Sequence, residues 1–156
     1  MFRGRFEHTV DGKGRVALPQ SARLVVEGFD ASGLLAMTRH PLQACALVMP
    51  MKVWTEDFEP KLMQISIADP VLDDVQLVLS SSFSEVELDK QGRLVVPQFL
   101  RRELGLDGEV CWIGSGRHMQ LWSKAALDAR VAEANTRIKS PEGRAQLPIA
   151  MGAIKL

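Results

Sequence analysis

The chain has 156 residues, of which 46% are hydrophobic and 24% are charged, and its formal net charge is zero. These values are typical of one compact globular domain and exclude a disordered or fibrous chain. No apolar run is long enough to cross a bilayer, and the first residues lack the hydrophobic segment of a signal peptide, so we expect a cytoplasmic protein.

The first elements are two short strands joined by a turn. Phe6, His8 and Val10 alternate with polar residues, which predicts a half-buried strand. Val16–Leu18 is β-prone and follows at once, so we expect the two strands to form a hairpin. Asp11 should cap the turn amides through its carboxylate.

One sequence pattern occurs twice in the chain. VDGKGRVALPQ at 10–20 returns as LDKQGRLVVPQ at 88–98, with a constant interval between matching residues. The matching pairs are Asp11/Asp89, Gly14/Gly92, Arg15/Arg93, Pro19/Pro97 and Gln20/Gln98, and outside the stretch Glu7/Glu85 and Arg23/Arg101. Because glycine is common to both turns only at Gly14 and Gly92, we expect these two to adopt a left-handed backbone. The repeat indicates that the chain arose when an ancestral half was duplicated and the two copies were fused.

Further elements follow in each half. Short helices should begin after Pro19 and Pro97 and end at Gly28 and Gly105. The next strands are expected at about Leu34–Thr38, Ala46–Met49, Glu109–Ile113 and Met119–Trp122. A helix from Lys52 should kink or restart at Pro60, and an alanine-rich helix should cover Lys124–Arg137.

The segment between the halves has two readings. Asp69 is a candidate N-cap and Pro70 a first-turn proline, and the apolar residues from Val71 to Leu79 fit one helical face. The alternative is a buried strand over Val75–Leu79. The resulting division is a first half at 1–68, a linker helix and joint at 69–82, a second half at 83–139 and a C-terminal tail at 140–156, which either stays a tail or docks as a strand.

The charge is unevenly distributed, although its total is zero. Residues 1–23 carry a net charge of +3, residues 24–88 carry −7 and residues 89–156 carry +4. A neutral total can therefore hide a polarised surface, and local fields steer a polyanion. Cys45 and Cys111 lie among apolar neighbours without metal-binding spacing, so both are predicted to be buried core thiols.

A strand–turn–strand–helix–hairpin unit used twice resembles the swapped-hairpin barrels of the AbrB/SpoVT superfamily, and more narrowly the MraZ family. The resemblance is carried by MFRGRFEHTVDGKGRVALP, VELDKQGRLVVPQFLRRELGL and LWSKAALDA. It implies an α+β, mainly β fold, in which tandem AbrB/SpoVT-like halves form one intramolecular swapped-hairpin β-barrel with flanking helices.

The resemblance also implies a function. MraZ-like proteins are bacterial transcription regulators that bind double-stranded DNA at promoter direct repeats of the division and cell-wall gene cluster, including their own promoter. They assemble into homo-oligomeric rings associated with the nucleoid, and the resemblance implies no cofactor, no membrane contact and no small-molecule substrate. By match, the DNA-contacting residues are Lys13, Arg15 and Arg93.

The residues themselves are consistent with that role. The guanidinium groups of Arg15 and Arg93 suit phosphate oxygens or guanine edges, and Lys90, like Lys13, should contact phosphates near a turn tip. Arg3 and Arg5 are expected to extend the positive patch, and Arg101 and Arg102 are weaker candidates for it. The structural alternative is that Asp11–Arg15 and Asp89–Arg93 only brace the turns, and the spacing fits both readings.

The sequence also bears on two other classes of protein. An enzyme is disfavoured, because the three histidines have no ligand spacing and there is no phosphate loop or nucleophile elbow. The alternative function is that of an AbrB-like antitoxin, which would neutralise a toxin with its tail, or of another structural or interaction protein of the same fold. Leu42, Ala44, Leu47, Val53 and Trp54 are candidates for a ring interface, although burial in their own core is the expectation for most of them.

Overall fold

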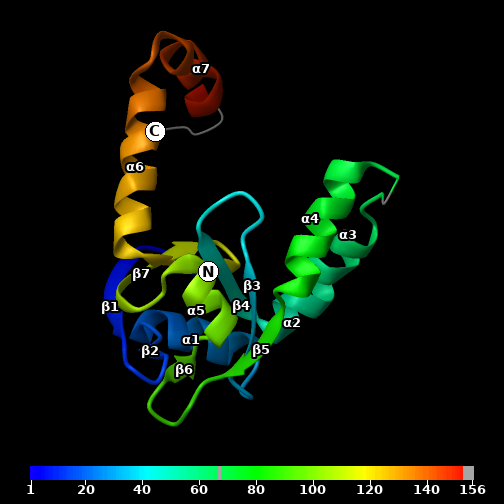
Figure 1. The fold of residues 1–156 in the computed structure, drawn as a ribbon, viewed down its shortest axis with the longest axis vertical. Coiled ribbons are helices and arrows are strands. Elements are labelled where there is room, and N and C mark those ends of the chain that lie inside the picture. Colours follow the sequence, from blue (N-terminus) through cyan, green and yellow to red (C-terminus); the bar gives the residue numbers. More distant parts are fainter. Residues whose placement is uncertain (67, 153–156) are drawn as a thin grey trace. The chain divides into compact units, whose positions relative to one another are not determined.

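A computed structural model describes residues 1–66 and 68–152. The chain divides into two units, Met1–Ser123 and Lys124–Leu156. In chain order the strands are β1 Arg5–Val10, β2 Arg15–Ala17, β3 Leu34–Arg39, β4 Cys45–Pro50, β5 Ser84–Glu87, β6 Arg93–Val95, β7 Gly108–Ser115 and β8 His118–Ser123. The helical segments are α1 Gln20–Phe29, α2 Met51–Val53, the π-helical turn η1 Trp54–Phe58, α3 Glu59–Met63, α4 Pro70–Ser81, α5 Gln98–Leu104, α6 Lys124–Lys139 and α7 Pro141–Gly152 (Figure 1).

The strands of the two halves pair with each other. The larger sheet has the order β1-β7-β8-β4-β3-β5, and β2 pairs with β6 in a separate two-stranded ribbon, all antiparallel. Strands β1, β3 and β4 of the first half correspond to β5, β7 and β8 of the second half. When each strand is replaced by its counterpart, the strand order of the larger sheet is the same, read from the opposite edge. The duplication seen in the sequence is therefore a pseudo-twofold relation in the fold.

This pairing corrects the predicted hairpin. β1 pairs with β7 and β2 pairs with β6, so β1 and β2 share a closed turn but no ladder. The exchange places Val16 and Leu94 opposite each other, and both are 1% exposed in one shared core. The α+β class and the exchange of strands between halves are confirmed, although the hydrogen-bonded strands form two sheets and not one continuous ladder around a barrel.

Both faces of the larger sheet are covered at its strands β3 and β4. Leu35 and Met37 of β3 face the core that the halves share, which also contains Trp112 and Leu94. The alternate residue Ala36 faces a second core with α2–α4. Because both faces are buried, β4 is apolar along its whole length and does not alternate.

The helices follow most of the predictions. The linker is a helix and not a strand: Asp69 Oδ1 accepts from the amides of Val71 at 2.9 Å and Leu72 at 3.3 Å, which caps α4. The helical segment after β4 restarts at Pro60, near the beginning of α3. Gly105 ends α5 with φ +61°, as expected.

Two predicted boundaries are wrong. Gly28 does not end α1, which continues to Phe29, a partly buried residue of the second core. The C-terminal segment is neither an open tail nor a strand: Pro141–Gly152 is a helix, and the Ser140 hydroxyl accepts from the Gly143 amide at 3.1 Å. Residues 153–156 of the predicted tail lie outside the described residues.

Buried polar groups join α4 to the sheet. The Thr38 hydroxyl donates to the carbonyl oxygen of Leu79 at 2.7 Å and lies 2.8 Å from the Ser82 hydroxyl. Cys45 and Cys111 are free and buried, as predicted. Burial raises the pKa of Cys45 to about 12. Across residues 1–66 and 68–152, no helix has the length and apolar character needed to span a bilayer.

Candidate nucleic-acid interface

The two turns have the same hydrogen-bond pattern. In the first, Asp11 Oδ1 accepts from the amides of Lys13 and Arg15, both at 2.9 Å. In the second, Asp89 Oδ1 accepts from the amides of Gln91 and Arg93, again both at 2.9 Å. The predicted Asx caps are therefore present in both halves.

The aspartates also hold the arginines. Arg15 Nε donates to Asp11 Oδ2 at 2.7 Å, and Arg93 Nε donates to Asp89 Oδ2 at 2.9 Å. The Arg15 amide and then its guanidinium lower the pKa of Asp11 to about 2, and the Arg93 amide leads the lowering of the Asp89 pKa. Both carboxylates are thus ionised at neutral pH, and each aims one guanidinium group.

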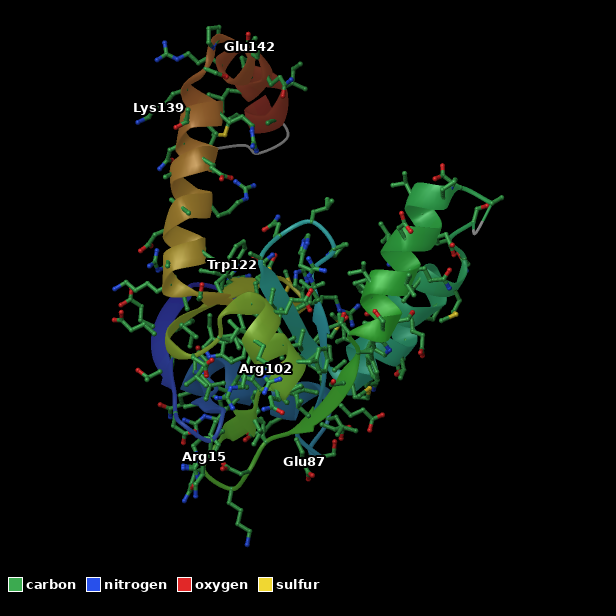
Figure 2. The ribbon with its side chains drawn as sticks, in the orientation of Figure 1. Arg15, Glu87, Arg102, Trp122, Lys139 and Glu142 are labelled. Atoms are coloured by element: carbon green, nitrogen blue, oxygen red, sulfur yellow. The ribbon has the colours of Figure 1, made fainter. Side chains whose placement is uncertain are left out.

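The register of the β2–β6 ribbon decides where the arginines point. Arg15 is opposite Val95, Arg93 is opposite Ala17, and the middle pair Val16 and Leu94 faces the core. Because side chains alternate along a strand, Arg15 and Arg93 lie on the same outer face, as diagonal neighbours about 7–8 Å apart. Their side chains are 35% and 33% exposed. Figure 1 shows β2 and β6 side by side, and Figure 2 shows Arg15 beside them.

The turns are locked across the halves. Gly14 and Gly92 have φ of +81° and +72°, which confirms the predicted left-handed backbone. The carbonyl oxygen of Gly14 accepts from the Val96 amide at 2.8 Å, and that of Gly92 accepts from the Leu18 amide at 2.9 Å. Trp112 Nε1 adds a bond of 3.0 Å to the carbonyl oxygen of Ala17, which anchors β2.

Each turn is also covered by an arginine from a helix of the other half. A Cβ atom added to Gly14 would lie 2.6 Å from Arg101 Nη1 of α5, and one added to Gly92 would lie 2.5 Å from Arg23 Nη1 of α1. Arg23 Nη1 donates to the carbonyl oxygen of Gln91 at 3.4 Å. Arg23 is not among the residues predicted for the site, although its repeat with Arg101 is the signal in the sequence that points to it.

The other predicted cations divide into two groups. Lys13 and Lys90 are exposed at the turn tips beside the arginines. Arg3 and Arg5 do not extend this patch, because Arg5 begins β1 and Asp11 follows its far end, six residues or about 20 Å along an extended chain. Arg5 instead contacts Glu7 at 3.2 Å, and its neighbour Gly4 accepts from the Gly114 amide of β7 at 2.8 Å. Arg102 is exposed on α5 (Figure 2).

His8 is half-buried, as its alternation predicted. Burial, and then the charge of Arg23, lower its pKa, so its imidazole is neutral at neutral pH. Within the described part of the chain, no three His, Cys, Asp or Glu side chains gather in a way that could hold a metal ion. The chemistry of the turn face is therefore that of fixed guanidinium and ammonium groups.

The chain is similar to known proteins of one family. A family model described as "MraZ protein, putative antitoxin-like" matches residues 81–147. A protein of Anaeromyxobacter sp. (strain Fw109-5), named "Transcriptional regulator MraZ", is 38% identical over 135 residues, which are 85% of this chain and 90% of that protein. The chain belongs to the MraZ family.

Other relatives carry the same printed name. The one of Coxiella burnetii (strain Dugway 5J108-111) is 36% identical, over 80% of this chain and 81% of its own. That of Methylobacillus flagellatus is 35% identical, over 85% and 88%. Among solved structures, the solution structure of PHS018 from Pyrococcus horikoshii aligns over 78% of this chain and 88% of its own, at 13% identity and a TM-score of 0.32.

Proposed function

We propose that this MraZ-family chain is a transcription regulator that binds double-stranded DNA in a sequence-specific way, through the face of the β2–β6 ribbon. The single observation that carries the proposal is the register that places Arg15 and Arg93 on one outer face. The relatives support the proposal, since each of them is named a transcriptional regulator.

The antiparallel β2–β6 ribbon is a kind of structure that can enter a DNA groove. A two-stranded antiparallel ribbon fits the major groove, which is about 12 Å wide. A guanidinium group can donate two parallel hydrogen bonds to O6 and N7 of guanine or to phosphate oxygens, and a lysine offers a charge for phosphate. Lys13 and Lys90 flank the arginines at the turn tips, so base reading and phosphate contact can come from one surface.

The bracing role of the aspartates is compatible with this function. Each carboxylate accepts a hydrogen bond from Nε of its arginine and two from amides of the turn. These bonds restrict the rotation of the arginine side chain. An arginine fixed in this way loses less rotamer entropy when it binds a partner. The structural and functional readings of the Asp–Arg pairs are therefore complementary.

The direct test is a titration of labelled DNA from immediately upstream of the chain's own gene, followed by fluorescence anisotropy. Arg15→Ala and Arg93→Ala should each weaken binding about tenfold or more, with unchanged circular dichroism. Lys52→Ala, which removes one exposed positive charge on α2, is the matched control and should bind as the unaltered chain does. Unaltered affinity in both arginine variants would return Asp11–Arg15 and Asp89–Arg93 to a purely structural role.

Salt dependence is a second measure of the same interface. Each phosphate neutralised contributes about 0.9 to the slope of log affinity against log salt concentration. A face with Lys13, Arg15, Lys90 and Arg93 should therefore give a steep slope. A flat plot would mean that the charged turns do not touch DNA.

We infer that the operator consists of direct repeats in promoters of the division and cell-wall gene cluster, including the chain's own promoter, and that the protein acts in the cytoplasm on the nucleoid. The family resemblance supports this inference. Footprinting upstream of the chain's own gene should reveal repeated protected segments, and protection without a repeat would contradict it.

We further propose a homo-oligomeric ring, in which neighbouring copies present their turns along one arc. One protomer offers few DNA contacts, and several linked sites gain affinity through effective concentration. Of the predicted interface residues, Leu47, Val53 and Trp54 are buried in the second core, whereas Leu42 is 88% exposed in the β3–β4 loop. Val71 and Leu77 of α4 are also exposed, at 68% and 64%, and are better candidates. Light scattering should report a mass above that of a dimer, and a monomer at working concentration would contradict the ring.

An antitoxin is the second candidate, because the matching family model is described as antitoxin-like. It would use the same turn face for DNA and a further segment for a toxin. Growth inhibition by a neighbouring gene, relieved when this chain is expressed with it, would favour the antitoxin over a regulator alone.

A further inference from the structure

The two turns are related by pseudo-twofold symmetry, but the hydrogen-bond partners of Arg15 and Arg93 differ. Arg15 donates through Nε to Asp11, and both terminal nitrogens of Arg15 have no partner among residues 1–66 and 68–152. Arg93 donates through Nε to Asp89, and its Nη2 also donates to Gln91 Oε1. The repeat places Lys13 where the second turn has Gln91, so the first turn has no equivalent acceptor.

The helix arginines that cover the turns differ as well. Arg101, over the first turn, donates to Asp107 Oδ1 from Nη2 at 2.7 Å and from Nε at 3.2 Å. Arg23, over the second turn, has no carboxylate partner in the described part of the chain, and its buried Nε has no hydrogen-bond partner there. The nearest acidic residue after α1, Asp30, is instead occupied by the hydroxyl and amide of Ser32.

We infer that the two turns do different work on DNA: Arg15 reads a base edge with its free fork, whereas Arg93 and Arg23 together hold the phosphate backbone. The inference rests on the proposed DNA binding. A terminal fork with two free nitrogens can make the paired bonds that identify guanine. Arg93 has one N–H of Nη2 occupied by Gln91 and stands beside the uncompensated charge of Arg23, which suits a phosphate oxygen.

Different roles for the two turns determine the symmetry of the DNA site that the protein recognises. A reader with true twofold symmetry matches a palindrome, because both halves make the same base contacts in opposite directions. A protomer that reads bases with one turn and holds phosphates with the other has a direction along the duplex. Successive protomers with one orientation therefore match repeats that all run the same way.

The test uses the full-length chain and a pool of randomised DNA duplexes, with repeated selection and sequencing. Lysine keeps the charge of arginine and loses its fork, so Arg15→Lys and Arg93→Lys form a matched pair. Arg15→Lys should relax the preference at a base position about tenfold, and Arg93→Lys should leave the selected sequence unchanged. Arg23→Gln should keep the selected sequence and lower the salt slope by about 0.9.

Each result decides one claim. Equal relaxation by Arg15→Lys and Arg93→Lys, or a palindromic sequence selected by the unaltered chain, would overturn the division of work between the turns. Arg23→Lys checks folding and should keep the full salt slope, so a slope lost in both Arg23 variants would assign Arg23 to bracing Gly92 alone. No enrichment by the unaltered chain would overturn the proposed function itself, which separates the two failures.

Discussion

Arg15 and Arg93 are diagonal neighbours on the outer face of the β2–β6 ribbon, Arg15 opposite Val95 and Arg93 opposite Ala17. They lie far apart in the sequence, and each is held by the aspartate four residues before it. Their common face is set by the pairing of Val16 with Leu94, since both of these side chains must be buried. A shift of the register by one residue would bury one arginine of the pair and expose its apolar neighbour.

The turn glycines should be sensitive to a single methyl group. Gly92→Ala places a Cβ atom at positive φ and 2.5 Å from Arg23 Nη1, so it should lower the free energy of unfolding by about 1–3 kcal/mol in urea melts. Gly105 has φ +61° and no atom within 4 Å of the added Cβ, so Gly105→Ala measures backbone strain alone. An equal loss in both variants would mean that Arg23 moves aside without cost.

Acid should weaken the first turn. The pKa of Asp11 is about 2 in the folded chain, below its ordinary value of 3.8, so the contribution of its ionised carboxylate is complete above about pH 4 and is lost as the pH falls toward 2. An NMR titration of the Asp11 carboxyl carbon should give a midpoint near 2. Asp11→Asn should remove this part of the acid dependence of stability, and an unchanged profile would show that the carboxylate is not responsible.

The linker helix should depend on its first residue. Asp69→Ala removes the acceptor for the amides of Val71 and Leu72 and should lower the free energy of unfolding by about 1 kcal/mol. Asp69→Asn retains a cap acceptor and is the matched control, expected within a few tenths of a kcal/mol of the unaltered chain. Thermal melts followed at 222 nm compare the two, and equal stability of the alanine variant would show that the cap contributes nothing.

The cysteines should be unreactive in the folded chain. Cys45 and Cys111 are each 0% exposed, and burial raises the pKa of Cys45 to about 12, so almost no thiolate is present at neutral pH. Modification by a thiol reagent should therefore proceed only as fast as the chain opens, and it should accelerate with urea. Rapid modification without denaturant would contradict the tight packing of β4 and β7.

Features that depend on neighbouring residues, and the duplication, could be predicted from the sequence. The Asx caps of Asp11 and Asp89, the left-handed Gly14 and Gly92 and the cap of α4 at Asp69 are local, because one side chain and a few amides define each of them. The family was also readable from the sequence, because its motifs are contiguous.

The contacts between distant residues could not be predicted from the sequence and became visible in the fold. Periodicity showed that β1 and β2 are strands, but their partners were found in the other half, because pairing there buries Val16 and Leu94 together. The same exchange carried Arg23 over Gly92 and left Arg5 at the far end of β1. The fold of each turn is thus a local matter, whereas the composition of the arginine face depends on long-range packing, which no short stretch of sequence encodes.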